Sequence, residues 1–367
     1  MHPEVIDVMT EVMKETFGNP SSIHQFGRQS RKKVDDARKV IADSIGAFMD
    51  EIIFTSGGTE ADNAAIMSSI QALKEKGKHI ITTEIEHHAV LHTCETLEKD
   101  GYEVTYLPVD ETGKVSIEEV KRALREDTIL VSIMYGNNEV GTIQPIQEIG
   151  ELLEDHQAFF HTDAVQAYGM MPIDVHELKV DFLSASAHKI NGPKGIGFLF
   201  ARKGVPFKPL LHGGQQERKR RAGTENVPSA VGFAKAAEIS KQCLAEKAER
   251  YQNFKKVMIH QFEDAGIDYK INGDLDNALP HVLNISFPGT NVEAFLVNMD
   301  LAGIAVSSGS ACTAGSIEPS HVLVSMFGKQ SERTKNSIRF SFGMGNTEDE
   351  VRKVAEMAVN IVKRLVK

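Results

Sequence analysis

The stretch at residues 51–85, EIIFTSGGTEADNAAIMSSIQALKEKGKHIITTEI, decides the fold that we expect for this chain. It opens with a short β-rich run, EIIFTS, continues with the longer run ADNAAIMSSIQALKEKG, and ends with a second β-rich run, HIITTEI. A short apolar run bounded by turn residues predicts a buried strand, whereas a longer amphipathic run predicts a helix. Strand, helix and strand in succession predict two parallel strands joined by a crossover helix.

The same alternation continues along the chain. It recurs as HIITTEI then HHAVLHTCETLEKDG, EVTYLPV then SIEEVKRALRED, TILVSIMY then QPIQEIGELLEDH, and AFFHTD then AVQAY. Repeated units of this kind predict an α/β fold, with a mostly parallel sheet covered by helices on both faces and right-handed crossovers. After DFLSASAHK, the turn and apolar run GPKGIGFLFARKG predict one or more antiparallel strands that close the sheet.

From about Ser229 the pattern changes to a long helical stretch, VGFAKAAEISKQCLAEKAERYQNFKKVMIHQFEDAG, which we expect to connect two domains. The runs HVLNISFPG, VEAFLVNMDLAGIAVSSGSAC, SIRFSFG and EDEVRKVAEMAVNIVKRLVK then predict a smaller α+β domain. A chain of 367 residues exceeds the size at which one hydrophobic core stops growing. We therefore expect a large domain over residues 1–245 and a small one over residues 246–367.

The composition, 41% hydrophobic and 25% charged, is that of an ordinary globular protein. A formal net charge of -10 argues against a dedicated binder of nucleic acid or anionic membrane, since both need a dominating positive field. No apolar run approaches the roughly 20 residues of a membrane helix, and the start, MHPEVIDVMTEV, lacks the regions of a signal peptide. We expect a cytoplasmic protein.

Three cysteines occur, at spacings that suit neither a disulfide framework nor a zinc knuckle. Cys94 and Cys243 lie in helical patterns, where packing is their expected role. Cys312 instead lies in residues 306–316, VSSGSACTAGS, among tiny and hydroxylated residues that bury little apolar area. That setting favours a thiol on a mobile loop near solvent, and an incidental cysteine in an ordinary loop is the alternative.

Residues 56–60, SGGTE, follow the first predicted strand and open a helix, so their backbone amides can face an anion such as a phosphate. An ordinary capped helix start is the alternative. The stretch matches neither a Walker loop nor a Rossmann fingerprint, which argues against a nucleoside triphosphate or NAD as ligand.

Two further predicted strands end in residues that carry charge. Asp163 ends AFFHTD, with Gln166 one turn later, and a carboxylate there needs a protonated pyridine nitrogen, a metal or an arginine as partner. Lys189 ends the run SASAHK, where a lysine can lose its proton and form an imine; a solvated lysine before a turn is the alternative.

Three other features stay open at this level. His88 and His92 lie four residues apart and could share a metal, although no third ligand is near; a histidine at a strand's end is better suited to stacking on a flat cofactor or to acid–base work. Residues 212–224, HGGQQERKRRAGT, form a basic loop that is either solvated or binds an anion or a partner. Arg339 in SIRFSFG suits a carboxylate held by two hydrogen bonds.

Taken together, the order and spacing of these motifs closely resemble the cysteine desulfurases, pyridoxal-phosphate enzymes of the class V aminotransferase fold. The motifs are TSGGTEADN, EIEHHAV, YGNNEVGTIQPI, HTDAVQAYG, SASAHKINGPKGIGFLF, HGGQQERKRRAGTENV, SSGSACTAGS and SIRFSFG. The resemblance runs from GNPSSIHQFG to Arg339, and SSGSAC is similar to the class with the longer mobile cysteine loop, here about residues 306–320.

The resemblance implies a role for each matching position. Lys189 would be the lysine that forms the imine with pyridoxal 5'-phosphate, and Cys312 the nucleophile that takes sulfur from L-cysteine as a persulfide and leaves L-alanine. The remaining positions would bind cofactor or substrate: His87 stacked on the ring, Asp163 on the ring nitrogen, Gln166 on the ring hydroxyl, Gly58, Thr59, Ser186 and His188 on the phosphate, Thr224 from a neighbouring subunit, and Asn138 and Arg339 on the substrate carboxylate.

The resemblance also implies a homodimer and a sulfur-acceptor protein, either an iron–sulfur scaffold or a tRNA-thiolating enzyme. A selenocysteine lyase or an aminotransferase of the same fold is the enzymatic alternative, and a non-enzymatic interaction module that uses residues 218–221 is the alternative from another class. Family members usually open with a strand and a turn of the type Asp-x-Ala-Ala-Thr-Thr-Pro ahead of the counterpart of His2-Pro3. This sequence starts after that turn, which is either absent or only omitted, so a wall on the substrate side of the pocket is not accounted for.

Overall fold

The structure is a computed structural model that describes residues 1–309 and 319–366. The chain divides into two compact units. Unit 1 comprises Met1–Leu107, Ile117–Tyr135 and Pro145–Leu244. Unit 2 comprises Pro108–Ser116, Gly136–Gln144 and Ala245–Lys367. Cys312 lies outside the described residues.

Unit 1 is built on a single sheet, which has seven strands within the described residues. In spatial order these are β1 (Ile52–Thr55), β7 (Gly197–Ala201), β6 (Phe182–Ser186), β5 (Phe159–Asp163), β4 (Thr128–Ser132), β2 (His79–Thr83) and β3 (Glu103–Leu107). The pairs from β6 to β3 are parallel, and β7 is antiparallel to both of its neighbours. The antiparallel strand predicted from GFLF is thus confirmed, and the fold is α/β with a mostly parallel sheet.

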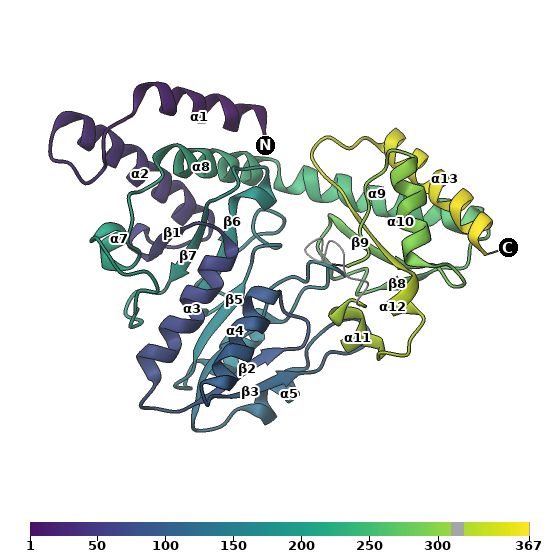
Figure 1. Ribbon diagram of the computed structural model, residues 1–367, viewed down its shortest axis with the longest axis horizontal. Coiled ribbons are helices and arrows are strands. Elements are labelled where there is room, and N and C mark those ends of the chain that lie inside the picture. Colours follow the sequence, from purple (N-terminus) through teal and green to yellow (C-terminus); the bar gives the residue numbers. More distant parts are fainter. Residues whose placement is uncertain (310–318, 367) are drawn as a thin grey trace. The chain divides into compact units, whose positions relative to one another are not determined.

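The helices of unit 1 cover this sheet (Figure 1). They are α1 (Pro3–Glu15), α2 (Gln25–Ser44), α3 (Gly58–Leu73), α4 (His88–Lys99), α5 (Ile117–Ala123), α6 (Ile146–Leu153), α7 (Gln216–Lys219) and α8 (Val227–Gln242), with 3-10 turns η1 (Met49–Glu51) and η2 (Ala187–Ile190). Every residue of β4 and β6 is buried, so both faces of the sheet are covered, as the near-continuous apolar runs predict.

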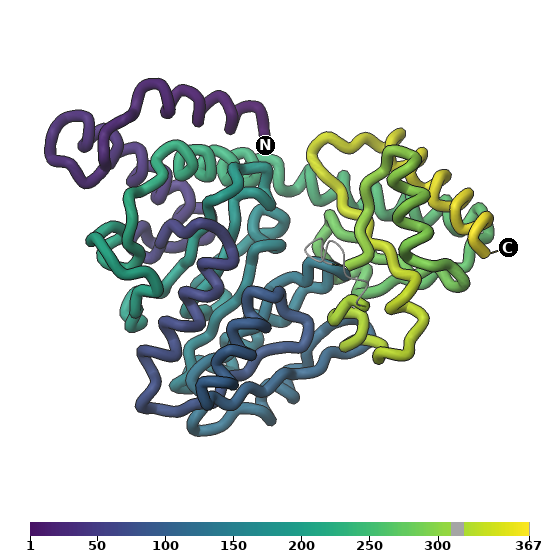
Figure 2. The backbone as a smooth tube through the Cα atoms, in the orientation of Figure 1, coloured from purple at the N-terminus to yellow at the C-terminus, as the bar shows by residue number. Residues whose placement is uncertain are grey.

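Helix α3 lies along the near face of the sheet in Figure 1 and contacts β1, β4, β5, β6 and β7. Its small side chains allow this close approach: Ala61 and Ala65 are fully buried. With α4 it encloses an apolar cluster that includes Ile70 and Cys94, which confirms the packing role predicted for that cysteine. Helices α1 and α2 both pack against α8, and the tube in Figure 2 shows the three running beside one another.

The run AVQAY, expected to form a helix after β5, is instead a sequence of turns. The carboxylate of Asp163 accepts a hydrogen bond from the backbone of Val165, and Tyr168 N donates to Ala164 O, so the chain coils tightly at the strand's end. The expectation was wrong because this segment is too short to repay helix nucleation and because an aspartate competes for the first backbone amides.

Unit 2 contains a sheet whose described strands are antiparallel, in the order β10 (Ser337–Ser341), β9 (Val282–Ser286) and β8 (Lys270–Asn272). Its helices are α9 (Leu244–Asp264), α10 (Val292–Leu301), α11 (His321–Phe327), α12 (Arg333–Asn336) and α13 (Glu348–Leu365). The long helical stretch predicted across residues 231–266 is interrupted at Cys243, the C-cap of α8, where the unit boundary follows. None of the helices within residues 1–309 and 319–366 has both the length and the apolar content that a membrane crossing requires.

Candidate active site

The polar residues predicted to carry chemistry in unit 1 follow strands that run in the same direction. Strands β2, β4, β5 and β6 are parallel, and β1 shares their direction because β7 is antiparallel to both β1 and β6. The carboxyl ends of these strands therefore form one edge of the sheet, which is where open α/β sheets bind ligands.

At the end of β1 the chain makes a turn through Gly57 and enters α3 at Gly58. A Cβ atom added to Gly58 would lie 2.6 Å from Val165 Cγ2, so no side chain fits there. One added to Gly57 would have Ser186 Oγ, at 3.9 Å, as its one neighbour within 4 Å among residues 1–309 and 319–366. The N-terminus of α3, the end of β6 and the turn after β5 thus meet at a spot where backbone amides are accessible and a helix dipole is positive.

A partly buried ion pair fixes this turn. Ser56 N donates to Glu60 Oε2 at 2.7 Å, and Arg221 donates through Nε and Nη2 to the two oxygens of Glu60, at 2.8 and 3.1 Å. Burial by itself raises the pKa of Glu60, but the hydrogen bonds from Arg221 and Ser56 bring that pKa below its ordinary value. Glu60 is therefore an anion that holds the turn on one side and Arg221 on the other.

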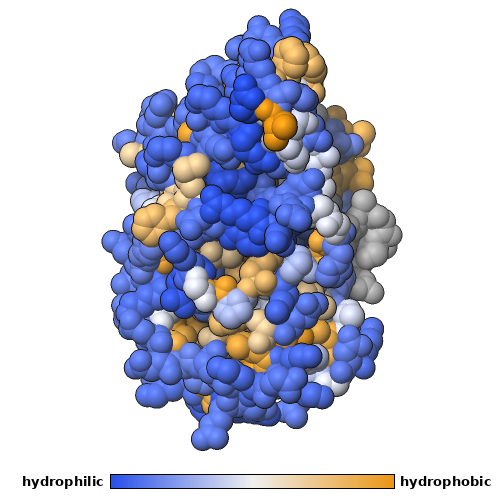
Figure 3. All heavy atoms as spheres, turned by 90° about the vertical axis from the view of Figure 1, so that its left-hand side faces the viewer, coloured by the Kyte–Doolittle hydropathy of each residue, from blue (hydrophilic) through white to orange (hydrophobic). Residues whose placement is uncertain are grey.

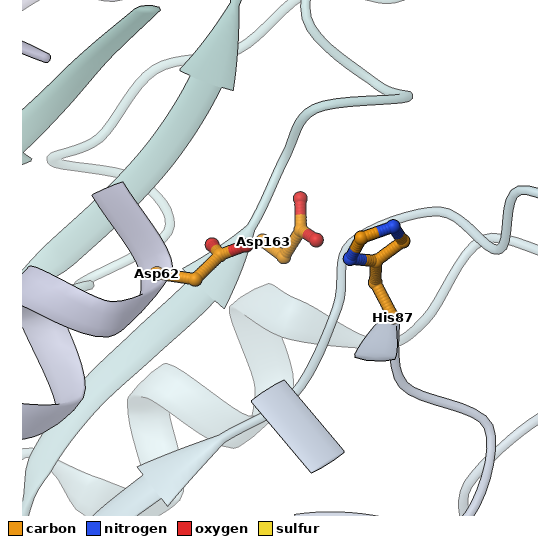
Figure 4. Close-up of side chains that lie close together, drawn as sticks. All are labelled: Asp62, His87 and Asp163. Carbon is orange, nitrogen blue, oxygen red and sulfur yellow. The ribbon is translucent and has the colours of Figure 1, made fainter. Parts of the chain in front are cut away.

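The centre of the site is a group of acidic side chains around Asp163. Asp62, on α3, and Asp163 are buried, and His87 is half-buried. One ligand atom of each lies within 4.8 Å of the other two, and Figure 4 shows the Asp163 carboxylate between Asp62 and the His87 ring. Burial raises the pKa of Asp163 to about 7, with the nearby Asp62 charge adding to the effect. A positive charge or a shared proton is needed to keep these carboxyl groups in place.

His87 is held by its own helix. It is the N-cap of α4, and its Nδ1 accepts a hydrogen bond from Ala89 N at 3.1 Å. Because Nδ1 accepts, the proton of a neutral ring is on Nε2. The grouping with Asp62 and Asp163 does not include His88 or His92, whose rings are 4.9 Å apart between centroids.

Glu86, in the loop between β2 and α4, is a further buried acid next to this group. Its Oε1 accepts from Thr83 Oγ1 at 2.6 Å and from Met134 N at 2.9 Å. Burial raises the pKa of Glu86 to about 8, and the charges of Asp163 and Asp62 add to that effect. Three carboxyl groups thus share one low-dielectric region at the carboxyl edge of the sheet.

The segment after β6 places a lysine and a histidine at the same edge. Ser186 Oγ and His188 Nδ1 are 2.8 Å apart, and His188 and Lys189 lie on the exposed side of η2. Partial desolvation of the His188 ring, followed by the charges of Lys189 and Lys194, lowers the pKa of His188. The positive charge of Lys189 also acts on Asp163 and opposes the rise in that group's pKa.

Comparison with known proteins decides which family this arrangement belongs to. The family model described as aminotransferase class-V matches residues 1–354. The chain belongs to this family. A Bacillus subtilis (strain 168) protein assigned provisionally to the cysteine desulfurases, as IscS 1, is 61% identical over 365 residues, covering 100% of this chain and 96% of that protein. The cysteine desulfurase IscS of Dictyoglomus turgidum is 48% identical over 365 residues, covering 100% and 92%. A solved structure named as a NifS-like protein superposes with a TM-score of 0.92 at 37% identity, covering 100% of this chain and 97% of that one.

These identities place the chain among the cysteine desulfurases of the class V family, as the motif pattern predicted. The residues that the resemblance assigned to the cofactor all lie in unit 1, and all but Thr224 lie at the carboxyl edge of its sheet. Gly58, Thr59, His87, Asp163, Gln166, Ser186, His188 and Lys189 all follow strands at the carboxyl edge of the sheet. Thr224 instead lies in the loop before α8, where it is exposed.

The two residues assigned to the substrate carboxylate of this desulfurase lie in unit 2 and are in contact. Arg339, on β10, donates from Nη1 to the backbone oxygen of Asn138 at 2.9 Å. The backbone of Arg339 also pairs with that of Ser307, at the start of the cysteine loop predicted over about residues 306–320. The residue after Asn138, Glu139, is buried, and its Oε2 accepts a 2.5 Å hydrogen bond from Ser320 Oγ.

The basic loop of this desulfurase is tied to the rest of unit 1 by ion pairs. Arg221 pairs with Glu60, and Arg220 is partly buried, which lowers its pKa. Arg38 of α2 donates to both oxygens of the buried Glu217, at 2.6 and 2.7 Å. Figure 3 views the molecule from the left-hand side of Figure 1. It shows strongly hydrophilic side chains gathered across the middle of that face.

The sequence reasoning gave no role to Asp62 and Glu86 at this site, or to Glu217 in the basic loop. Asp62 had a signal, because it is the one charged residue in the buried run ADNAAIMSSI. Glu217 had none, since its arginine partner is 179 residues away in the chain.

Proposed function

We propose that this chain is a pyridoxal-phosphate-dependent cysteine desulfurase that converts L-cysteine to L-alanine and transfers the sulfur to Cys312 as a persulfide. The observation that carries the proposal is the buried carboxyl group of Asp163 at the end of β5, next to the accessible helix start at Gly57 and Gly58. It occurs in a chain that is 61% identical over 365 residues to a relative assigned provisionally to this activity, and 48% identical to a relative named as a cysteine desulfurase.

The residues fit the cofactor on three grounds. Asp163 is a buried carboxyl group that requires a cation, and a protonated pyridine nitrogen is one. The turn at Gly57 and Gly58, with the hydroxyl of Ser186, offers the amides and hydroxyl that a phosphate needs, and it has room because no Cβ is present. Lys189 supplies the amine at the same sheet edge.

When bound, pyridoxal phosphate supplies a ring that accepts the electrons left on the substrate α-carbon. Asp163 would hold the ring nitrogen in its protonated form, with His87 against the ring and Gln166 at its hydroxyl. Gly58, Thr59, Ser186 and His188 would hold the phosphate, with Thr224 contributed by a second subunit. Lys189 would move protons at the α-carbon, a task for which its position after β6 suits it.

The overall reaction balances without an external oxidant. L-Cysteine and the Cys312 thiol yield L-alanine and a Cys312 persulfide: the substrate carbon–sulfur bond breaks, a sulfur–sulfur bond forms, and the carbon gains a hydrogen. Carbon is reduced while the two sulfur atoms are oxidised. Cys312 would attack as a thiolate, the nucleophilic form of cysteine.

Unit 2 would bind the amino acid. Arg339 and Asn138, which are in contact, would hold the substrate carboxylate, since a guanidinium matches a carboxylate with two parallel hydrogen bonds. The persulfide would then pass to an acceptor protein that serves iron–sulfur cluster assembly or tRNA thiolation, and a homodimer would complete the site through Thr224.

The test compares two cysteine variants and two lysine variants. With L-cysteine and a reductant, the unmutated protein should form alanine and sulfide in equal amounts, and Cys312→Ser should abolish both, whereas Cys243→Ser, a change at a half-buried cysteine, should leave both intact. Lys189→Ala should remove the visible absorption band of the bound cofactor, and Lys194→Ala, at an exposed lysine, should retain it. Unimpaired sulfide production by Cys312→Ser would contradict the persulfide step.

A further inference from the structure

The family resemblance assigned no role to Asp62, although it lies at the centre of the site. It is on the second turn of α3, its side chain is 1% exposed, and its carboxylate is turned toward Asp163 (Figure 4). Its Oδ1 forms no hydrogen bond with any of the described residues. A buried oxygen without a partner is costly unless the group is neutral or a donor approaches it.

The histidine at ion-pair distance from Asp62 supplies no positive charge. His161, on β5, is the described residue whose ring lies at ion-pair distance, with Nε2 3.5 Å from Asp62 Oδ1. Both ring nitrogens of His161 are already engaged, Nδ1 with Ser132 Oγ at 2.8 Å and Nε2 with Ser184 Oγ at 3.0 Å. Burial lowers the pKa of His161 to about 4, so this ring is neutral at ordinary pH.

The remaining ionisable groups near this pair are acidic, apart from His87 and Lys189. Asp163 lies on β5 and Glu86 on the loop after β2, both buried. Two carboxylates at this separation in a low dielectric cannot both ionise, so the pair holds one proton. Burial raises the pKa of Asp62 to about 7, against an opposing hydrogen bond from Ser184.

The surroundings decide which of the two carries that proton. Asp163 accepts a hydrogen bond from Val165 N at 2.8 Å and is acted on by the positive charge of Lys189, and both interactions favour its ionised form. Asp62 has a carboxylate oxygen with no donor and a neutral imidazole beside it. The proton therefore belongs on Asp62.

We propose that Asp62 is a positioning residue: as a carboxylic acid it holds the proton of the Asp62–Asp163 pair and thereby keeps Asp163 an anion for the cation bound at the site. The inference rests on the proposed function only for the identity of that cation, the pyridine nitrogen of pyridoxal phosphate. This role is compatible with the burial of Asp62, because burying a neutral carboxylic acid next to Asp163 costs less free energy than burying a second carboxylate there.

The experiment measures the protonation of Asp62 directly, by infrared difference spectroscopy of the protein loaded with pyridoxal phosphate, at about pH 6, below the value near 7 at which Asp62 titrates. Subtracting the spectrum of Asp62→Asn from that of the unmutated protein should show the loss of a carboxylic-acid carbonyl band. Asp43→Asn is the matched control, because Asp43 is 57% exposed and paired with Lys39, and its difference spectrum should show the loss of a carboxylate band. Loss of a carboxylate band in Asp62→Asn would overturn the proposal.

A second measurement covers the case in which Asp62→Asn does not fold. Aspartate labelled with carbon-13 at its carboxyl carbon, in the otherwise unmutated protein, should shift a carboxylic-acid band, which separates it from any acid band of Glu86. Absence of a shifted acid band would overturn the proposal.

Cofactor affinity provides a third, independent readout. Asparagine resembles a protonated aspartate, so Asp62→Asn should bind pyridoxal phosphate with less than about a ten-fold loss; a loss of about ten-fold or more, the effect of removing a charged partner, would overturn the proposal. A protein that never acquires the visible cofactor band would refute the proposed function instead, and the infrared measurement on that protein would still report on the acid pair.

Discussion

Replacing Arg38 with methionine should release the left-handed turn in α7. Three consecutive residues there, Glu217, Arg218 and Lys219, have φ of 47°, 57° and 68°. None is glycine, and each left-handed residue costs roughly 1–2 kcal/mol. The turn persists because Glu217 is tied at three points: both oxygens bind Arg38, and Oε2 also accepts from Phe54 N at 3.1 Å.

The size of the effect follows from the burial of this pair. The side chains of Arg38 and Glu217 are 6% and 2% exposed, and removing one member of a buried ion pair costs about 3–5 kcal/mol. The released turn can relax and let Glu217 reach water, so we expect the lower end, about 3 kcal/mol. For a chain of this length that corresponds to a fall in Tm of roughly 5 °C.

The assay combines thermal unfolding with hydrogen exchange of peptides covering residues 212–224. Arg38→Met should lower the Tm and speed exchange in those peptides, whereas Lys32→Met, at an ion pair whose members are 75% and 61% exposed, should change neither by much. The double variant Arg38→Met, Glu217→Leu should recover most of the stability, because no buried charge remains without a partner. Equal Tm values for Arg38→Met and Lys32→Met, with unchanged exchange in the loop, would refute the reasoning.

Three further predictions address the site. Glu86→Gln should remove a pH dependence of the free energy of unfolding. The pKa of Glu86 rises from 4.5 to about 8 on folding, so between those pH values the native state keeps a proton that the unfolded state releases. The free energy of unfolding of the unmutated protein therefore falls with rising pH by up to about 1.4 kcal/mol per pH unit. The variant should therefore gain on the unmutated protein in urea midpoints measured at pH 8 relative to pH 5, and a parallel pH profile would contradict the assignment. Arg221→Met should remove the partner of Glu60 and loosen the turn at Ser56. It should weaken binding of pyridoxal phosphate by about 3- to 10-fold and leave binding of phosphate-free pyridoxal unchanged, as measured by titrations of the visible band. Equal losses of affinity for both ligands would point to a general disturbance of the site instead. Asp163→Asn should weaken cofactor binding at least about 10-fold, because an amide cannot neutralise a pyridinium; an affinity equal to that of the unmutated protein would remove Asp163 from the proposed role.

Much of unit 1 could be predicted from local patterns. Buried strands such as β4 and β6 read as continuous apolar runs because both of their faces are covered, and their parallel order follows from the helices between them. Asp163 and Lys189 could be singled out because each is a charged residue that follows such a run. The turns at AVQAY could not be predicted from apolar content, because one side chain, Asp163, competes with the helix for the first backbone amides.

The sequence by itself determined the succession of strands and helices, the family, and the set of polar residues that end at one edge of the sheet, because hydrophobic periodicity and turn chemistry are local properties of the chain. Only the tertiary structure decided that Asp62 faces Asp163 and that Glu217 meets Arg38. The state of a buried charge depends on what lies across from it in space, and partners on different elements are set by packing, which no local stretch of residues encodes.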